Sequence, residues 1–180
     1  KKHENTLRDI SVQLITNYNI NVLLKVLTQN LLKLGIRGCY ISLYETTENI
    51  PTLFDLPEKS RLIFAFEDGM RKEFDADGIV YDSKRILPDG FMASPRQRSS
   101  VVHSLNFKDK HLGFIIFEVG LQEGSLYTIL SNLISSAIYG AQLYTRSENV
   151  NELLQNTLDN VHNKSEIVSE RSSNISRNVN

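Results

Sequence analysis

The clearest alternation of apolar and polar residues in the chain lies between Ser99 and Gly120. Its first half alternates strictly, so one face of a strand would carry Val101, His103, Leu105 and Phe107. Its second half, Leu112 to Val119, is apolar at nearly every position. Two such segments joined by a short polar turn predict an antiparallel β-hairpin. Because the second segment is apolar on both faces, we expect it to be an interior strand of a sheet covered on both sides.

Three further segments show the apolar spacing of amphipathic helices. The most regular runs from Leu23 to Leu34, with Asn19 or Asn21 as a candidate N-cap and Gly35 as a left-handed residue that ends it. A shorter stripe precedes it and is formed by Leu7, Ile10 and Leu14. A long helix is expected to begin near Ser125 and to continue without a clear stop signal.

The end of the chain carries a heptad pattern, in which seam positions recur at alternating steps of four and three. The apolar seam residues are Leu154, Leu158, Val161, Val168, Ile175 and Val179. Serines occupy two further seam positions, 165 and 172, so the coiled coil is expected to be weak. We expect a parallel homodimer through this seam, with the N-terminal stripe as its companion in a four-helix arrangement.

The remaining strands are predicted in the middle of the chain. Cys39–Tyr44 alternates between an aliphatic face, expected to pack against helices, and a face that carries Tyr40, Ser42 and Tyr44. Arg61–Glu67 is expected to be a strand with Leu62, Phe64 and Phe66 on one face. Residues 69–98 are too long for a structureless connection and are expected to hold short strands and a lid over the sheet. The short links favour an antiparallel sheet and an α+β fold.

Composition narrows the function classes. The 180 residues include 20 Lys and Arg against 21 Asp and Glu, a net charge of −1 that gives no reason to expect nucleic-acid binding. No apolar segment approaches the roughly 20 residues that span a bilayer, so no membrane contact by this segment is expected. One cysteine excludes an intrachain disulfide and fits a reducing compartment. These features favour a cytoplasmic location.

Catalytic and metal-binding patterns are weak in this sequence. Four histidines and one cysteine do not have a zinc-site spacing, and neither a phosphate-binding loop nor a nucleophile elbow occurs. We therefore expect a protein that is not an enzyme and holds no metal. Arg96, Arg98, Lys108 and Lys110 are expected to be solvated loop charges, with anion recognition at a pocket mouth as the alternative.

The residues from Leu23 to Glu45, from Val101 to Asn106 and from His111 to Glu118, followed by the long closing helix, resemble a GAF domain. GAF domains are PAS-like sensory domains of multidomain bacterial signalling proteins. The resemblance implies a six-stranded antiparallel sheet with helices on one face and a ligand pocket under a lid on the other. It implies three parts: a linker helix at 1–17, a sensor domain at 18–147 and a signalling helix at 148–180.

The specialised GAF classes are disfavoured because their residue patterns are missing. The spaced pattern of cyclic-nucleotide binders cannot be placed, and Cys39 is followed by Tyr40 rather than by the histidine of bilin binders. A haem protein would need an axial histidine, and neither His103 nor His111 has a supporting pattern. We therefore expect no resident cofactor, only an unidentified small-molecule ligand.

The expected function is a non-enzymatic sensory module that relays ligand binding through its terminal helices to an output domain outside this chain. The serine- and asparagine-rich heptads resemble the signalling helix of a methyl-accepting chemotaxis receptor. The alternative is a GAF domain without ligand that serves as a dimerisation scaffold in a kinase, cyclase or transcription regulator. The expected pocket wall is Tyr40, Ser42, Tyr44, Phe64, Phe66, Phe91 and His103.

Overall fold

The computed structural model describes residues 2–45, 57–75, 77–92, 97–120 and 124–178. The helices are α1 (Lys2–Ile15), α2 (Ile20–Asn30), the short 3₁₀ helix η1 (Leu32–Leu34) and α3 (Gly124–Asn178). The strands are β1 (Cys39–Tyr44), β2 (Lys59–Glu67), β3 (Met70–Arg71), β4 (Ile79–Asp82), β5 (Ser100–Phe107) and β6 (Lys110–Glu118).

The six strands form one sheet in the order β3-β2-β1-β6-β5, and β4 also pairs with β2. Every pairing is antiparallel. The predicted hairpin is confirmed as β5 and β6, and β6 is an interior strand between β1 and β5. The α+β class and the six-stranded antiparallel sheet are thus confirmed.

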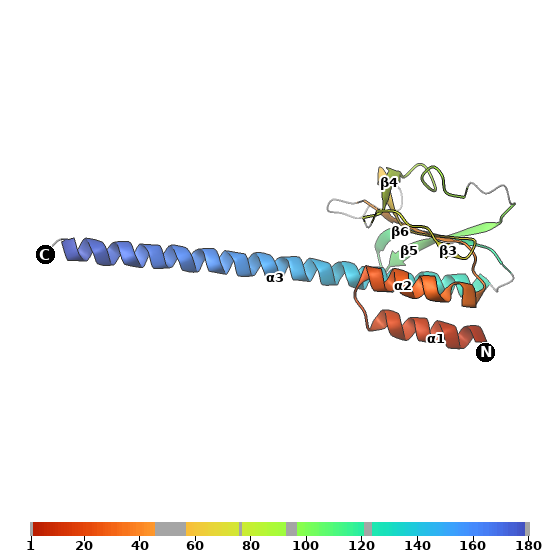
Figure 1. The fold of residues 1–180 in the computed structure, drawn as a ribbon, viewed down its shortest axis with the longest axis horizontal. Helices are drawn as coiled ribbons and strands as arrows, with labels where there is room; N and C mark the ends of the chain where they lie inside the picture. Colours follow the sequence, from red (N-terminus) through yellow and green to blue (C-terminus); the bar gives the residue numbers. More distant parts are fainter. Residues whose placement is uncertain (1, 46–56, 76, 93–96, 121–123, 179–180) are drawn as a thin grey trace. The chain divides into compact units, whose positions relative to one another are not determined.

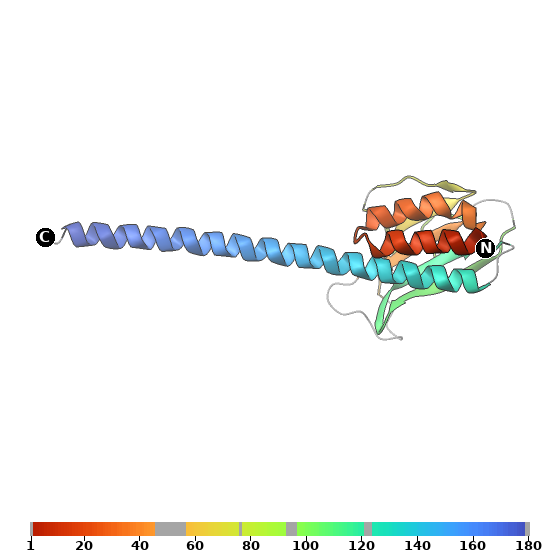
Figure 2. The same ribbon diagram turned by 90° about the horizontal axis from the view of Figure 1, so that it is seen from below.

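The helices cover one face of this sheet (Figure 1). As predicted, Asn19 caps α2, because its side chain accepts a hydrogen bond of 2.8 Å from the amide of Asn21. Gly35 ends η1 in the left-handed conformation, with φ of 74°. Figures 1 and 2 show α1 on the side of α2 and α3 that faces away from the sheet. The helices therefore form two layers beneath the sheet.

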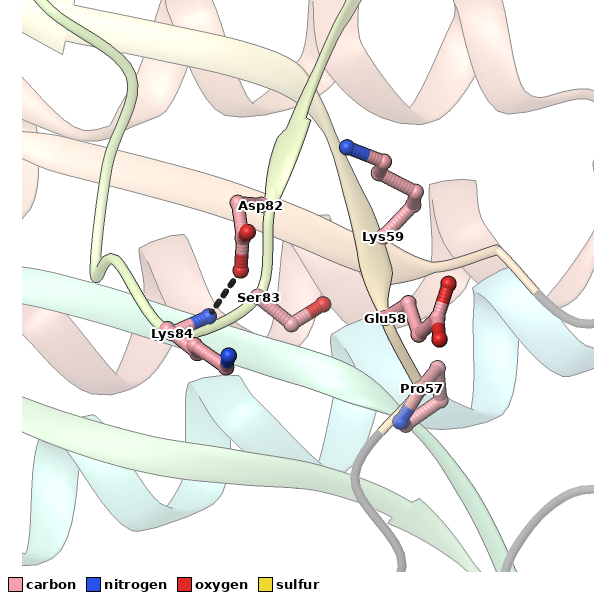
Figure 3. A pocket seen from close by; sticks show the side chains of 6 residues that line it. All are labelled: Pro57, Glu58, Lys59, Asp82, Ser83 and Lys84. Atoms are coloured by element: carbon pink, nitrogen blue, oxygen red, sulfur yellow. Dashed lines mark hydrogen bonds between the residues drawn. The ribbon is translucent and has the colours of Figure 1, made fainter.

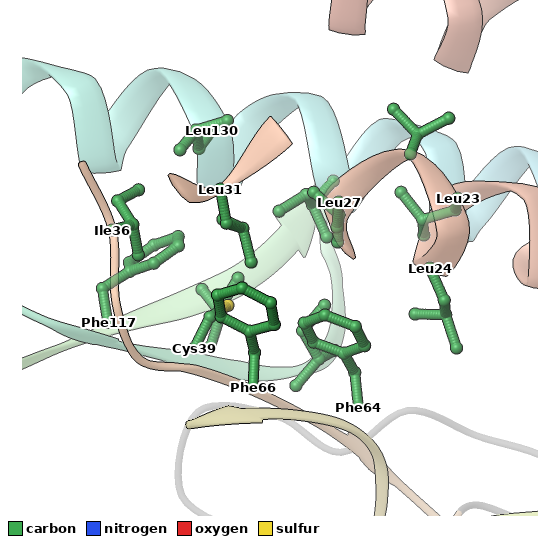
Figure 4. Close-up of a cluster of buried hydrophobic side chains, with 14 of the residues drawn as sticks. Leu23, Leu24, Leu27, Leu31, Ile36, Cys39, Phe64, Phe66, Phe117 and Leu130 are labelled. Carbon is green, nitrogen blue, oxygen red and sulfur yellow. The ribbon is translucent and has the colours of Figure 1, made fainter. Parts of the chain in front are cut away.

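The core between sheet and helices is apolar. Leu27 and Leu31, from the α2 segment, and Leu130 of α3 are fully buried, as are the sheet residues Phe64 and Phe117 (Figure 4). Each fully buried side chain of this size contributes roughly 1.5–3 kcal/mol through removal from water. This core also contains Ile10 and Leu14 of α1.

The burial of Ile10 and Leu14 corrects one expectation. Both side chains are at most 4% exposed in the core of their own domain, so they cannot form the exposed stripe that was expected to join the coiled coil. The chain divides into two compact units, Lys1–Ala141 and Gln142–Asn180. Helix α1 lies within the first of these units.

A smaller apolar cluster covers the other face of the sheet, under the segment from Phe74 to Met92. We call this face the lid face and that segment the lid. The buried members of this cluster are Tyr40, Leu62, Ala65, Tyr81, Leu87 and Ile116. Phe74 and Phe91 cover them, with their rings in edge-to-face contact at a centroid distance of 6.1 Å. The expected short strands and covering segment are present.

A β-bulge in β2 overturns the predicted alternation of that strand. Ile41 of β1 lies opposite Phe64, but the next residue, Ser42, lies opposite Leu62. Ile63 is therefore an extra residue, and Leu62 turns to the lid face while Phe64 and Phe66 face the helices. The grouping of Leu62 with these two phenylalanines was wrong for this reason.

In the second unit, the described seam side chains of α3 are exposed. Leu154, Leu158, Val161 and Val168 are each more than half exposed. The side chain of Ile175 and all of Val179 lie outside the described residues. Dimerisation through this seam stays a prediction. Among the helices that the structure describes, none is long and apolar enough to cross a membrane.

Candidate functional site

A groove of about 360 Å³ opens on the lid face of the sheet, beside the lid cluster. Its floor comes from three neighbouring strands, with Tyr44 of β1, Phe114 of β6, and Val102 and Ser104 of β5. Its wall is the lid turn that follows β4, Ser83 to Ile86. We call this hollow the lid groove. Its volume falls within the range of small-molecule sites.

The apolar part of the lid groove is partly exposed. The rings of Tyr44 and Phe114 lie 6.1 Å apart at an angle of 55°. Ile86 is 55% exposed and Val102 is 49% exposed. A bound molecule with an apolar body would remove this surface from water, which favours binding by about 25 cal/mol per Å².

Several polar groups of the lid groove already have partners. The Ser83 hydroxyl lies 2.7 Å from that of Ser60, and the Ser104 hydroxyl donates to Asn106 Oδ1 at 2.8 Å. Arg85 forms a two-point ion pair with the carboxylate of Asp89. These groups fix the shape of the groove more than they offer free hydrogen bonds.

Two other groups of the groove make no hydrogen bond within the described part of the chain. They are the hydroxyl of Tyr44 and the ammonium of Lys84. Only the backbone amide of Lys84 is engaged, as a donor to Asp82 Oδ1 at 2.9 Å. Burial raises the pKa of Tyr44, so this hydroxyl keeps its proton at neutral pH. Both groups are therefore donors.

A second hollow of about 530 Å³ borders the same lid turn (Figure 3). Its described lining is Pro57, Glu58, Lys59, Asp82, Ser83 and Lys84. Among its described lining residues, two lysines, one of them the Lys84 shared with the groove, stand against two carboxylates, and there is no aromatic ring. We regard the lid groove as the better candidate for an organic ligand.

Four of the seven predicted pocket residues lie on the lid face, but only Tyr44 lines the lid groove. The Tyr40 hydroxyl donates to Glu67 Oε1 at 2.8 Å, and Ser42 Oγ accepts from the Tyr81 hydroxyl at 2.7 Å. Phe91 packs on the lid cluster. Tyr40, Ser42 and Phe91 thus fill the space under the lid and support it.

The other three predicted pocket residues lie on the helix face, which corrects their assignment. Phe64 and Phe66 are buried in the core beneath the helices, at most 1% exposed (Figure 4). His103 pairs across the strands with Ile115, and its ring makes an edge contact with Phe117 at 6.2 Å. Residues directly opposite in a sheet share a face. Because Phe64, Phe66 and His103 each lie opposite a residue that faces the helices, their side chains do not line the groove.

The pocket wall predicted from the sequence did not include the groove residues Ser83 to Ile86, Val102 and Phe114. Val102 could have been found, because it occupies the lid-face position of a strand whose alternation was recognised. Phe114 lies in β6, which is apolar on both faces and gives no such signal. The lid turn carries no local signal that would bring it over β5 and β6. Its position depends on the pairing of β4 with β2, from Lys59–Asp82 to Leu62–Ile79.

Two charged networks fix the end of the sheet where β2 and β6 terminate. Glu67 accepts hydrogen bonds from Tyr40 and, at 3.1 Å, from the amide of Met92, and it lies 3.5 Å from Lys72 Nζ. Burial alone would raise the pKa of Glu67, but these hydrogen bonds and the charge of Lys72 lower it overall. Glu67 therefore holds the lid to the sheet as a carboxylate.

Arg98 is not the solvated loop charge that was expected. Its side chain is 7% exposed and joins Asp68 at 3.0 Å to Glu118 at 3.1 Å. The guanidinium therefore connects the turn after β2 to the end of β6. The alternative role for Arg98, anion recognition at a pocket mouth, is not compatible with these two carboxylate partners. Arg96 lies outside the described residues.

The only cysteine of the chain, Cys39, is fully buried in the helix-side core. Burial raises the pKa of its thiol, which disfavours the reactive thiolate. Within the described ranges, no three His, Cys, Asp or Glu side chains are placed to hold a metal ion. No family model matches the chain, and neither a curated protein nor a solved structure matches it.

Proposed function

We propose that this chain is a non-enzymatic sensory module of the GAF type. It binds a small molecule in the lid groove and passes the change through its terminal helices to an output domain outside residues 1–180. The resemblance of the serine- and asparagine-rich heptads favours a methyl-accepting chemotaxis receptor as the parent protein. The composition favours a cytoplasmic location.

The observation that carries this proposal is the lid groove. It combines an aromatic floor, exposed aliphatic walls and donors without acceptors on a sheet whose other face is fully packed. A site of this kind fits binding of an organic molecule, because an apolar floor combined with a few polar groups can both bury a ligand and fix its orientation.

The helix α3 supports the relay. Its N-terminal part contributes buried residues to the core below the sheet, among them Leu130, Ile134 and Ile138. The same helix continues to Asn178 and carries the exposed seam. An isolated helix of this kind gains its stability mainly from association, so we propose a homodimer through the seam. A shift between two packings of this weak seam then carries the output.

A second function, a ligand-free dimerisation scaffold in a kinase, cyclase or transcription regulator, is favoured by one observation. The centre of the lid face is filled by its own side chains, and the hydroxyls of Tyr40 and Ser42 are already hydrogen-bonded. Only the lid groove at the side of the cluster is open. A scaffold of this kind would need no ligand there.

A thermal-shift screen of residues 1–180 against metabolites separates the two functions. A compound that binds only the folded protein raises its melting temperature by mass action. At a hundredfold excess over Kd the stabilisation is about 2.7 kcal/mol, which is several degrees for a domain of this size. If no compound raises the melting temperature, the sensory proposal fails and the scaffold remains.

The homodimer is tested by sedimentation with charges placed on the seam. The variant Leu154→Glu with Val161→Glu puts like charges at positions that would face each other in a parallel pair. The control, Asn156→Glu with Asn163→Glu, adds the same charge away from the seam. We expect the seam variant to be monomeric and the control to dimerise as before. Equal dimerisation of both variants would contradict an interface at this seam.

The relay has its own test. If ligand binding and dimerisation are coupled, a saturating ligand from the screen must change the dimer dissociation constant, because coupling is reciprocal. Sedimentation with and without the ligand measures this change. A dissociation constant that does not change would show that the groove and the seam act independently.

A further inference from the structure

The lid groove contains two hydrogen-bond donors whose acceptor is missing from the described part of the chain. The Tyr44 hydroxyl contributes one, and the Lys84 ammonium contributes the other, together with a full positive charge. The second cation of the groove, Arg85, is neutralised by Asp89. Asp82 accepts from the amide of Lys84 but lines the second hollow and not the groove. Lys84 also borders the second hollow, and among the described groove residues it is the one charged side chain without an ion pair.

We propose that the lid groove binds a small organic carboxylate with a flat apolar body. This inference rests on the proposed function and names the chemical class of its ligand. A carboxylate offers two acceptor oxygens to the two donors, and its single negative charge matches the single free ammonium. The dianion of a phosphate monoester would leave one negative charge without a partner.

The apolar body is assigned from the floor and walls of the groove. The tilted pair of Tyr44 and Phe114 presents aromatic surface, and Ile86 of the wall and Val102 of the floor each expose about half of their area. Aromatic rings favour offset or edge contacts with a flat partner. An acid without an apolar body, such as acetate, would use the donors but leave this surface in water.

Isothermal titration of residues 1–180 tests the ligand class with benzoate, phenylacetate and indole-3-acetate as probes. The matched controls are the three corresponding amides, which keep the shape and lose the charge. Acetate and inorganic phosphate test the anion without the apolar body. We expect at least one of the three aromatic acids to bind at least tenfold more tightly than its amide and than both small anions.

Three substitutions test the position of the site. Lys84→Gln removes the charge and is expected to weaken binding of the acid about tenfold, while binding of the amide stays unchanged. Tyr44→Phe keeps the ring and loses the second donor, for an expected loss of roughly threefold to tenfold. The control is Lys59→Gln, because Lys59 lines only the second hollow and should leave binding unchanged. All three positions lie at the surface or strand end, and circular dichroism verifies folding.

The outcomes separate this inference from the proposed function. The carboxylate assignment is overturned if the amides bind as tightly as the acids, or if phosphate binds more tightly than the acids. It is also overturned if Lys59→Gln weakens binding and Lys84→Gln does not. If none of the aromatic acids binds, the carboxylate assignment is overturned as well. The sensory function survives these results when the metabolite screen finds a ligand of another class, and it fails together with the inference when the screen finds none.

Discussion

The two faces of the sheet differ in how their side chains are used. The helix face is covered by α2, η1 and α3, and its core is continuous and apolar, with Phe64, Phe66 and Phe117 fully buried. The lid face is covered by a single segment, and its buried cluster includes the hydroxyl-bearing residues Tyr40 and Tyr81. The lid groove is also on this side. The helix face is built for stability, and the lid face leaves surface that a ligand can use.

This difference follows from the sequence of the strands. In β1, the residues facing the helices are Cys39, Ile41 and Leu43, which carry no hydroxyl or charge. The residues between them carry hydroxyls, and each hydroxyl needs a partner when it is buried. Tyr40 and Ser42 find partners within the protein, whereas Tyr44, at the end of the strand, does not within the described residues. The groove therefore lies at the one of these three β1 hydroxyls that has no hydrogen-bond partner among the described residues.

The strongest test of this comparison is the removal of one phenyl ring from each face. Phe66→Ala empties a fully buried site under the helices and should lower the free energy of unfolding by about 3–5 kcal/mol. Phe91→Ala makes the same chemical change in the half-buried lid and should cost about 1–2 kcal/mol. Urea unfolding followed by circular dichroism measures both. Equal losses would show that the lid is as important for stability as the helix-side core.

The second test uses two glycines. Gly113 of β6 has a φ of 153°, and a Cβ atom there would lie 2.1 Å from the carbonyl oxygen of Ser42. Gly113→Ala should therefore cost about 3 kcal/mol, through strain and displacement of β1. Gly90 of the lid has a φ of 90°, but among the described residues, its two chain neighbours aside, no atom lies within 4 Å of its Cβ position. Gly90→Ala should cost only about 1 kcal/mol, and a larger loss than at Gly113 would reverse the comparison.

The contrast between the faces was only partly predictable from the sequence. Periodicity identified the hairpin, the helices and the two faces of β1, because the alternation of side chains is local. It could not tell which face of β2 joins which face of β1, since that depends on the pairing register. The register places Cys39 opposite Phe66, and the extra residue Ile63 then turns Leu62 to the other face. In a strand that is apolar at most positions, the sequence does not show where such an extra residue interrupts the pairing.

The dependence on strand pairing and distant contacts also explains why the site residues were only partly predicted. Tyr44 was found because it lies on a strand face with a clear pattern. His103 was assigned to the pocket from its chemistry, although its alternation with Leu105 and Phe107 already placed it on the apolar face. Arg98 looked like a loop cation because its partners, Asp68 and Glu118, are 30 and 20 residues away in the sequence. Ion pairs over such separations are visible only in the folded chain.

The third test concerns the charges that border the lid face. Arg98→Met removes both ion pairs and leaves Glu118, 14% exposed, without this partner, so stability should fall by about 2 kcal/mol. Arg85→Met is the matched control, because its ion pair with Asp89 is exposed and should contribute nothing measurable. Thermal unfolding of both variants makes the comparison. A neutral Arg98→Met would mean that the methionine side chain replaces the network as well as arginine does.

The smallest expected effect comes from Glu67, which links the lid to the sheet. The pKa of its carboxyl is lower in the folded protein than the usual 4.5, so its contribution is fully present above about pH 4.5 and is lost as the pH falls through the folded value. Glu67→Gln should therefore cost about 1 kcal/mol at pH 7, and the difference from the unchanged protein should shrink below pH 4.5. Urea titrations at pH 7, 5.5 and 4 measure it. In the control, Glu45→Gln, the ion pair with Arg61 is more exposed and a smaller loss is expected. A loss at Glu67 that is independent of pH would show that the acceptor oxygens of this side chain, and not its charge, hold Met92 and the lid in place.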